Sequence, residues 1–469
     1  MEERFNLIVI GSGPGGYVAA IKAAKLGMKT ALIENGEIGG TCLNRGCIPT
    51  KTLMHSSHLY YEAQGFMDAG ICFTGLSYDY DKIKDRKDEV VNKIRQGIVA
   101  LLEANGVAIL HGTAMIKKNH RILLKSFEKV KELETEKILI ATGSKPVIPN
   151  IEGAHLNNVV TSDELLSRSG GPYQKLLVIG GGVIGIEFAT IFRELGCEVE
   201  IIEALDRILP NMDKEISQSI SMSLKKKGIM IHTKAKVVKI SEAIDNGLCC
   251  EYEEKDTLKN TAAEGILLAI GRRANTKDLF EEGFSLEMEG PNIKVNSDFE
   301  TNEPGIYAIG DVTKGKQLAH AASAQGIVAV ERMANKEPSI DINVIPSCIY
   351  TVPEVAVVGM SEEEAMYNGY SVKVGKYPML GNSKTILSMG ERGYIKVICD
   401  ATTDRILGAS LLCDRATDMV SEFATAIVGG MTFKDLASVI RPHPTYSEAI
   451  TEALEDVAGM AIHLMPKKR

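Results

Sequence analysis

The chain has 469 residues, of which 45% are hydrophobic and 24% are charged, and its formal net charge is −8 at pH 7. This length exceeds what one hydrophobic core can support and predicts about three domains. The composition is that of a globular protein, and the negative charge disfavours a surface built to bind nucleic acid. Apolar runs such as Leu7–Ile10 end at glycines and are too short to cross a bilayer, so no membrane association is expected.

The N-terminal residues Met1–Asn6 carry acidic side chains and lack the basic and apolar regions of a secretory signal, which favours a cytoplasmic protein. The nine cysteines are an odd number scattered along a long chain, unlike the disulfide framework of a small secreted protein. In a reducing compartment, a pair that does form a disulfide is expected to be catalytic rather than structural.

The first informative segment is the apolar run Leu7–Ile10, followed by GSGPGG at residues 11–16. The run predicts a buried parallel strand, and the glycines permit a tight turn and close approach of the backbone to a diphosphate. Apolar residues within Tyr17–Ala24 recur at helical spacing, so the turn is expected to open a helix whose N–H groups face the phosphate. The next strand, Thr30–Ile33, ends in Glu34, which is placed to accept hydrogen bonds from ribose hydroxyls. The glycines expected to contact the dinucleotide are Gly11, Gly13 and Gly16.

The same pattern returns at Leu176–Ile179, followed by GGGVIG at residues 180–185. A strand at Val199–Ile202 then ends in Glu203. Glu34 follows Gly11 by 23 positions (34 − 11), and Glu203 follows Gly180 by 23 (203 − 180). One glycine motif is weak evidence, because glycine turns between a strand and a helix have many uses. Two copies with the same spacing predict two dinucleotide sites.

Glu203 bears on which dinucleotide binds at the second site. A carboxylate accepts a hydrogen bond from a free 2′-hydroxyl but repels a 2′-phosphate, and no arginine follows until Arg207. The sequence therefore favours NAD over NADP.

Between the two motifs lies GGTCLNRGCIPTK, with Cys42 and Cys47 separated by four residues. This spacing does not match the short spacings of zinc ligands. On an ideal helix the two Cα atoms would be separated by about 7.5 Å along the axis, beyond the roughly 4.4–6.8 Å of a disulfide. A bridge therefore requires a distorted turn, and Gly46 and Pro49 are the residue types expected there. A disulfide held in such a turn is expected to be reducible, whereas the alternative is two unbridged core cysteines.

The other cysteines show no pattern that suggests a partner. The neighbours Cys249 and Cys250 are interpreted as a strand with one buried and one exposed thiol, rather than as a redox pair. The remaining five are Cys72, Cys197, Cys348, Cys399 and Cys413.

Near the C-terminus, His443 stands between two prolines and is followed by Glu448. The prolines restrict the backbone, and Glu448 is close enough in sequence to hold the imidazole in one tautomer. By itself a histidine between prolines is more often part of a structural turn. Together with a disulfide that exchanges protons it becomes a candidate base.

At these motifs the chain resembles the pyridine nucleotide–disulfide oxidoreductases of class I, and within them the branch that oxidises dihydrolipoamide. The resemblance extends over essentially the whole chain. Its motifs, in order, are the first glycine motif, Gly39–Lys51, Ala141–Ser144, the second glycine motif with Glu187, Ala269–Arg273, Thr301–Val312 and His443–Glu448.

The resemblance implies an α/β fold with two Rossmann-like dinucleotide-binding domains, for FAD and NAD, and an α+β C-terminal interface (dimerisation) domain. The FAD domain is expected to be split, with Gly305–Asp311 returning to it so that Asp311 binds the ribityl chain. The expected segments are 1–148 (FAD), 149–274 (NAD), 275–343 (return to the FAD domain) and 344–469 (interface).

The resemblance also implies the cofactor contacts. Lys51 and Glu187 are expected to pair beside the flavin ring. Besides the glycines already named, the expected FAD contacts are Glu34, Thr41, Lys51, Gly112, Ala141, Thr142, Gly143, Asp311 and Ala319. The expected NAD contacts are Gly180, Gly182, Gly185, Glu187, Glu203, Val237 and Gly271.

The implied reaction is oxidation of protein-bound dihydrolipoamide by a Cys42–Cys47 disulfide in a homodimer. His443 of the partner subunit, oriented by Glu448, is expected to remove a thiol proton, and the electrons are expected to pass through FAD to NAD. The implied partner is a lipoyl-bearing acyltransferase core or a lipoyl carrier protein of a multienzyme complex, such as a 2-oxo acid dehydrogenase. No metal is expected.

The sequence departs from the family pattern at Arg45, Ala274 and Val352, of which Arg45 adds a positive charge expected to favour thiolate. The alternatives are another NAD(P)H-dependent disulfide reductase, of the glutathione, trypanothione or mercuric type, and a non-catalytic flavoprotein subunit. Glu203 disfavours the NADPH-dependent reductases, and the absence of a C-terminal cysteine pair disfavours the mercuric type. The intact cysteines, His443 and Glu448 disfavour a scaffold, and the cysteine spacing disfavours a metal-binding module.

Overall fold

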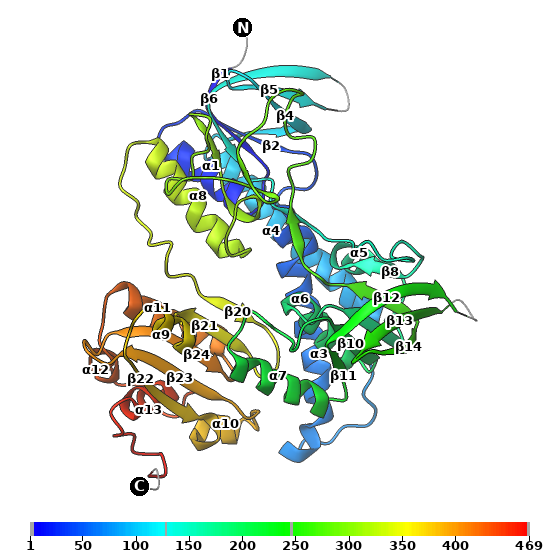
Figure 1. Cartoon of the computed structure of the whole chain (residues 1–469), viewed down its shortest axis with the longest axis vertical. Coiled ribbons are helices and arrows are strands. Elements are labelled where there is room, and N and C mark those ends of the chain that lie inside the picture. The colour runs from blue at the N-terminus through cyan, green and yellow to red at the C-terminus, as the bar shows by residue number, and fades with distance from the viewer. Residues whose placement is uncertain (1–3, 127–128, 244–246, 467–469) are drawn as a thin grey trace. The chain divides into compact units, whose positions relative to one another are not determined.

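The computed structural model describes residues 4–126, 129–243 and 247–466. The first residues of the acidic N-terminal segment and the last three of the cysteine-free tail, for which the sequence made predictions, lie outside this description. The chain forms two compact units, drawn in Figure 1. Unit 1 comprises residues up to 180, 191–202 and 235–342, and unit 2 comprises residues 181–190, 203–234 and 343–469.

The described residues include no helix that is long and apolar enough to span a membrane. The predicted domain limits at residues 148, 274 and 343 stay predictions.

Unit 1 contains most of the strands. Its helices are α1 (Pro14–Lys25), α2 (Gly40–Arg45), α3 (Cys47–Gln64), η1 (Phe66–Ala69), α4 (Tyr80–Ala104), α5 (Ser162–Ser167), η3 (Gly310–Val312) and α8 (Ala319–Met333). Its strands are β1 (Arg4–Ile10), β2 (Thr30–Glu34), β3 (Ala108–His111), β4 (Thr113–Lys117), β5 (Arg121–Lys125), β6 (Val130–Ile140), β7 (Ser144–Pro146), β8 (Val159–Thr161), β9 (Lys175–Ile179), β12 (Ala235–Glu242), β13 (Leu248–Glu254), β14 (Thr257–Ala263), β15 (Gly265–Leu268), β16 (Arg272–Ala274), β17 (Met288–Glu289), β18 (Asn292–Ile293) and β19 (Ile306–Ala308). Two further elements, α6 (Val183–Glu194) and β10 (Glu198–Glu203), have residues in both units.

The first glycine motif lies at the edge of a seven-stranded sheet with the order β3-β2-β1-β6-β5-β4, to which β19 adds beside β6. The strands β3, β2, β1, β6 and β19 are parallel. Strand β5 pairs antiparallel with β6, and β4 pairs antiparallel with β5. The segment that the resemblance expected to return to this domain therefore does so as β19.

Strand β1 shows why this sheet is buried on both faces. Leu7 and Val9 pack in one hydrophobic cluster with residues of α1, α4 and α8, whereas Ile8 and Ile10 pack in another with residues of β4 and β5. Successive side chains of a strand point to opposite faces, so a continuous apolar run is what a parallel strand covered on both faces requires.

The second glycine motif follows β9, which pairs in parallel with β10 on one side and with β15 on the other, and β15 pairs in parallel with β8. The strands β12, β13 and β14 form an antiparallel sheet, and their apolar side chains pack in one hydrophobic cluster with those of β9 and β15. Both predicted strand–turn–helix segments are therefore present, and their strands are parallel as expected.

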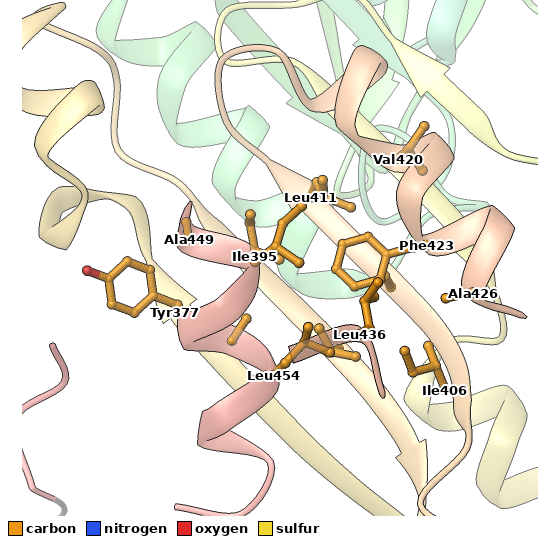
Figure 2. Packing of buried hydrophobic residues seen from close by; sticks show 14 of the residues in the cluster. Tyr377, Ile395, Ile406, Leu411, Val420, Phe423, Ala426, Leu436, Ala449 and Leu454 are labelled. Carbon is orange, nitrogen blue, oxygen red and sulfur yellow. The ribbon is translucent and has the colours of Figure 1, made fainter. Parts of the chain in front are cut away.

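Unit 2 is built on an antiparallel sheet with the order β20-β21-β24-β23-β22. The strands of this sheet are β20 (Ser347–Ile349), β21 (Val355–Gly359), β22 (Val372–Pro378), β23 (Tyr394–Asp400) and β24 (Ile406–Leu412), and unit 2 also contains β11 (Met230–Thr233). Its helices are α7 (Lys214–Lys226), α9 (Glu362–Tyr367), η4 (Met379–Gly381), α10 (Ser383–Leu387), α11 (Ala416–Val428), α12 (Phe433–Ala437) and α13 (Glu448–Asp456). Figure 2 shows helix side chains such as Phe423 and Leu454 packed against Ile395 and Leu411 of the sheet.

Phe423 is fully buried in this cluster, so truncating it leaves a cavity that the surrounding strands cannot fill. We expect Phe423→Ala to lower the opening free energy of β23 and β24 by about 3–5 kcal/mol, measured by native-state hydrogen exchange. Val428→Ala, at an exposed position of the same helix, is the control and should change it by less than about 0.5 kcal/mol. Equal protection of the strand amides in both variants would contradict this account of the core.

Candidate functional site

The first glycine turn begins where β1 ends. Gly11 has φ +100°, and a Cβ atom there would lie 2.4 Å from the carbonyl oxygen of Ala141. Only glycine satisfies both constraints, because other residues rarely adopt this φ and would clash with the neighbouring backbone. A Cβ placed at Gly13 would meet no atom within 4 Å, so the surface of the turn is open at the point where a diphosphate is expected.

Glu34 closes this turn from the end of β2. One of its carboxylate oxygens accepts hydrogen bonds from the amide and hydroxyl of Ser12, at 2.9 and 2.6 Å. The other accepts from the amide of Gly36 at 2.8 Å. The buried carboxylate of Glu34 therefore stabilises the backbone of the glycine turn. The sequence analysis did not predict this role. Each carboxylate oxygen can accept more than one hydrogen bond, so the ribose contact predicted for Glu34 stays open to it.

The second glycine turn repeats this geometry. In unit 1, Gly180 has φ +111°, and a Cβ there would lie 2.5 Å from the carbonyl oxygen of Ala269. In unit 2, the carboxylate of Glu203 accepts from the amides of Gly181 and Leu205, both at 2.7 Å. The acid and its first amide partner are 22 positions apart in both motifs. The sequence repeat therefore corresponds to a repeated hydrogen-bond pattern.

The two turns differ at one side chain. Ser12 adds a hydroxyl that donates to Glu34 and accepts from the amide of Gly39 at 3.1 Å. The equivalent position of the second motif is Gly181, so Glu203 has only amide partners. This hydroxyl joins the first turn to the loop that precedes the cysteines.

The other expected NAD residues are divided between the units. Val237 is buried in β12 and Gly271 has φ +127°, and both belong to unit 1. In unit 2, Glu187 is buried and one of its oxygens accepts from the amide of Tyr350 at 3.2 Å. A Cβ at Gly182 would meet no atom within 4 Å. That these residues together with Gly185 contact NAD stays a prediction.

The remaining expected FAD contacts surround the first turn or lie beyond the return strand. Ala141 donates from its amide to the carbonyl of Ile10 at 2.8 Å, directly beside the turn. The hydroxyl of Thr142 is buried and has no hydrogen-bond partner among the residues that the structure describes. Asp311, in η3, accepts from the hydroxyl of Ser144 at 2.6 Å. Ala319 is the first residue of α8, and Gly112 follows β3 with φ +149°.

These residues of unit 1 fit a flavin dinucleotide. The open surface over Gly13 suits a diphosphate, and the buried, unpartnered Thr142 hydroxyl needs a polar group that a ligand would supply. The carboxylate of Asp311 suits the hydroxyls of a ribityl chain.

The two candidate redox cysteines lie on either side of a break between two helices, which we call the redox turn. Cys42 lies in α2, which ends at Arg45, and Cys47 is the first residue of α3. Gly46 separates the two helices, and a Cβ there would lie 3.0 Å from the carbonyl oxygen of Thr41. The predicted interruption between the cysteines is confirmed at Gly46. Pro49 does not distort the helix, because it lies in the first turn of α3, where a missing amide costs nothing.

Cys42 and Cys47 interact with each other across the break at Gly46. A hydrogen bond with Cys47, together with burial, raises the pKa of the Cys42 thiol, whereas the positive charge of Lys51 acts in the opposite direction. Cys42 is half-buried and Cys47 is exposed.

The other cysteines differ from this pair in their surroundings. Burial raises the pKa of Cys197, Cys250 and Cys399 to about 12, so these thiols stay protonated and unreactive at neutral pH. Cys250 is buried in β13 and its neighbour Cys249 is half-buried, as the strand interpretation of this pair expected, although Cys249 is less exposed than predicted. The described residues contain no group of three or more histidine, cysteine or acidic side chains arranged to hold a metal ion.

In unit 2, His443 and Glu448 form the predicted pair. His443 Nδ1 lies 2.9 Å from one oxygen of Glu448, and the other oxygen accepts from the amide of Thr445 at 2.8 Å. Burial raises the pKa of Glu448, but the bonds from Thr445 and His443 outweigh it and lower the pKa below its usual value. An ionised Glu448 assigns the proton to Nδ1, which leaves Nε2 of the 70% exposed His443 side chain able to accept one.

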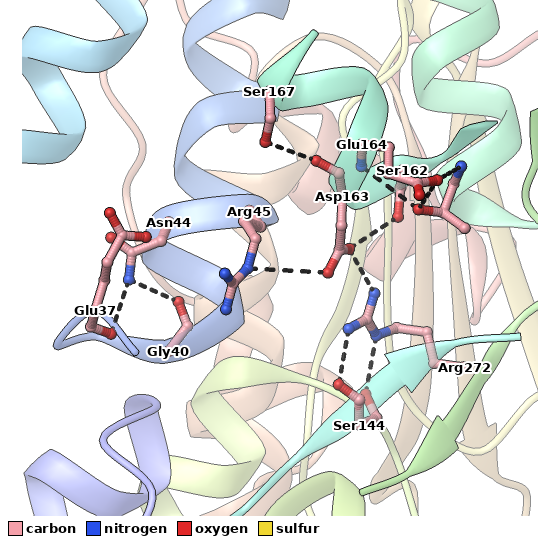
Figure 3. Close-up of polar contacts among 11 residues, drawn as sticks. Glu37, Gly40, Asn44, Arg45, Ser144, Ser162, Asp163, Glu164, Ser167 and Arg272 are labelled. Carbon is pink, nitrogen blue, oxygen red and sulfur yellow. Dashed lines mark hydrogen bonds and ion pairs between the residues drawn. The ribbon is translucent and has the colours of Figure 1, made fainter. Parts of the chain in front are cut away.

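Arg45 has a partner that the sequence did not reveal. Its guanidinium lies 4.0 Å from Asp163 of α5, and Asp163 also meets Arg272 of β16 (Figure 3). The charge expected to favour thiolate is therefore shared with a carboxylate, and it is Lys51 that lowers the pKa of Cys42. Asp163 belongs to no recognised motif, so only the packing of α2 against α5 identifies it. The pairing of Lys51 with Glu187 stays a prediction.

Comparison with known proteins is consistent across sequence and structure. Residues 5–326 match the family described as pyridine nucleotide-disulphide oxidoreductase, and residues 345–454 match its dimerisation domain. The chain is 39% identical to a dihydrolipoyl dehydrogenase of Bacillus subtilis, over 99% of this chain and 100% of that protein. It is 37% identical to a dihydrolipoyl dehydrogenase of Staphylococcus aureus, over 98% of both.

The chain is also similar to a solved structure of a flavoprotein disulfide reductase. The HOCl-induced flavoprotein disulfide reductase RclA from Escherichia coli superposes with a TM-score of 0.85 and 30% identity, over 96% of this chain and 99% of that one. The two glycine turns with their acids, the interrupted cysteine helix and these full-length matches lead to one conclusion. The chain belongs to the pyridine nucleotide–disulphide oxidoreductases and is an enzyme with FAD and NAD as cofactors.

Proposed function

We propose that this enzyme is a dihydrolipoyl dehydrogenase, which oxidises protein-bound dihydrolipoamide to lipoamide and reduces NAD to NADH. The observation that carries the proposal is the position of Cys42 and Cys47 on either side of the break at Gly46, beside a turn that fits FAD. The relatives that share the full length of the chain and bear this name support the choice of substrate.

The chain's own residues supply the thiol chemistry. Nε2 of His443 takes a proton from one thiol of dihydrolipoamide, and the ionised Glu448 stabilises the imidazolium that forms. The resulting thiolate attacks the Cys42 sulfur of the disulfide, so the Cys42–Cys47 bond breaks and Cys47 leaves as a thiolate. The second substrate thiol loses its proton and attacks the mixed disulfide, which releases Cys42 and closes the lipoyl disulfide.

The two cysteines have different roles in this scheme. A hydrogen bond with Cys47 and burial raise the pKa of the Cys42 thiol, and the family motif assigns Cys42 as the sulfur that is attacked and Cys47 as the sulfur that leaves. Bound FAD supplies the electron acceptor that returns the dithiol to a disulfide, with NAD as the final hydride acceptor. We assign Lys51 and Glu187 to the flavin ring as a pair, on the basis of the family motif.

We infer that the active form is a homodimer and that the acting base is His443 of the partner subunit. The match to a dimerisation domain over residues 345–454 supports this, because His443 lies within it. Its 70% exposed side chain is available to another molecule. The partner protein that delivers substrate is a lipoyl-bearing acyltransferase core or lipoyl carrier protein, and the proposed location is the cytoplasm.

Cys42→Ser removes the sulfur that the substrate thiolate attacks. We expect dihydrolipoamide oxidation to fall by about a thousandfold or more, because no other group replaces the sulfur that the substrate thiolate attacks. Steady-state NADH formation measures this, with flavin absorbance to confirm that FAD is retained. Cys72→Ser, an exposed cysteine outside the motif, is the control. Near-normal turnover of Cys42→Ser would exclude the proposed route.

His443→Gln tests the base. We expect the disulfide half-reaction to slow by about 10²–10⁴-fold, while electron transfer from NADH to an artificial dye stays intact. His463→Gln is a matched control, because His463 is as exposed as His443. It pairs at 2.6 Å with Glu452, which lies in α13 as Glu448 does. Equal loss of both reactions in His443→Gln would instead assign this histidine a folding role.

Glu203 is the basis of the dinucleotide preference. We expect kcat/KM for NAD to exceed that for NADP by about tenfold or more, because a buried carboxylate repels a 2′-phosphate. Glu203→Gln should narrow this ratio, and Glu198→Gln, at the exposed start of the same strand, should not. Equal kcat/KM values for the two dinucleotides in the unmodified enzyme would refute the preference and favour a glutathione-type reductase.

A further inference from the structure

A chain of polar contacts within unit 1 leads from the redox turn to Asp311. Arg45 Nε lies 4.0 Å from Oδ2 of Asp163, and Oδ1 of Asp163 lies 3.3 Å from Nη1 of Arg272. Arg272 donates from Nε to the hydroxyl and from Nη2 to the carbonyl of Ser144, both at 2.9 Å. The hydroxyl of Ser144 in turn donates to Asp311 at 2.6 Å. Figure 3 shows Asp163 between the two guanidinium groups.

The charges and burial of these residues indicate that their side chains are fixed in orientation. Asp163 is one carboxylate facing two cations, and its side chain is 23% exposed. The side chain of Arg272 is only 12% exposed and has two hydrogen bonds to one residue. An isolated surface ion pair contributes little, whereas a network of partly buried, charge-assisted bonds orients its members. Arg45, with 44% of its side chain exposed, is the outer member.

The position of Arg45 gives this network access to the cysteines. Arg45 is the last residue of α2, and only Gly46 separates it from Cys47. Gly46 has no side chain to pack, so the direction of the chain after α2 depends on how the end of that helix is held. The preceding residue, Asn44, donates to the carbonyls of Glu37 and Ile38 at 3.2 and 3.1 Å, which ties α2 to the loop before it. Arg45 supplies the second tie, to α5.

We propose that Asp163 is a positioning residue for the redox turn: it holds Arg45 at the end of α2 and, through Arg272 and Ser144, couples this helix to Asp311. The proposal rests on the redox role proposed for Cys42 and Cys47. Asp163 acts through Arg45 and Arg272. Its effect is to keep the Cys47 sulfur in one position and to make that position depend on the same network that orients Asp311.

The test uses the full-length enzyme with FAD and two kinds of measurement. The first is the rate of iodoacetamide alkylation of the reduced thiols, and the second is the thiolate–flavin absorbance of the reduced enzyme. We expect Asp163→Asn and Arg45→Gln each to raise the alkylation rate by about two- to fivefold and to reduce the absorbance in proportion. Asp163→Glu, which keeps the carboxylate, should restore most of both. Glu103→Gln, which removes an exposed charge from α4, is the control and should leave both unchanged.

The two variants also separate the two ends of the network. Asp163→Asn should additionally weaken retention of FAD on dilution, because Arg272 loses its anionic partner, whereas Arg45→Gln should retain FAD normally. The alkylation rate and absorbance of the double variant should match those of Asp163→Asn alone, since both substitutions break the same contact between Arg45 and Asp163. Alkylation rates and absorbance equal to those of the unmodified enzyme in both single variants would overturn the proposal. A lack of the thiolate–flavin absorbance in the unmodified enzyme would instead overturn the redox role of the cysteines.

Discussion

The hydrogen bond from a glycine-turn amide to the acid at the end of the following strand is the interaction on which both dinucleotide sites depend. Glu34 and Glu203 each hold two backbone amides, one in the turn and one just beyond the acid itself. A buried carboxylate is costly unless hydrogen bonds to charge compensate it, and here the amides provide them. Each acid thereby fixes the turn in the form that leaves its open face to a phosphate, before any ribose is bound.

The redox turn depends on the first of these sites. Ser12 bonds both Glu34 and the amide of Gly39, so the turn that receives the diphosphate is tied to the loop that begins the cysteine motif. From there α2 leads to Gly46, where the helix is interrupted and Cys47 begins α3. Flavin site and thiols are thus parts of one continuous hydrogen-bonded segment of unit 1. The second glycine motif lacks this hydroxyl, in keeping with its having no cysteines to position.

Unit 2 holds the residues proposed for acid–base chemistry on a different scaffold. A compact antiparallel core supports α13, and the first residue of that helix, Glu448, holds both His443 and the amide of Thr445. Because the carboxylate fixes the tautomer, the exposed edge of the imidazole is the one that can accept a proton. A rigid core behind an exposed base suits a group that acts on a substrate from outside its own unit.

The sequence by itself determined the parts of this protein that depend on local rules. Apolar runs, glycines between a strand and a helix, and the repeated spacing of 23 positions from the first glycine to the acid (34 − 11 and 203 − 180) predicted both strand–turn–helix segments, because their geometry is set within one stretch of chain. The pairs Cys42–Cys47 and His443–Glu448 were found for the same reason. Only the tertiary structure decided that Gly46 alone interrupts the cysteine helix and that the acids hold amides. It also decided that Asp163 faces both Arg45 and Arg272, which lie 118 and 109 positions away from it in sequence (163 − 45 and 272 − 163). Such contacts follow from the packing of helices and strands across the fold, which no local pattern encodes.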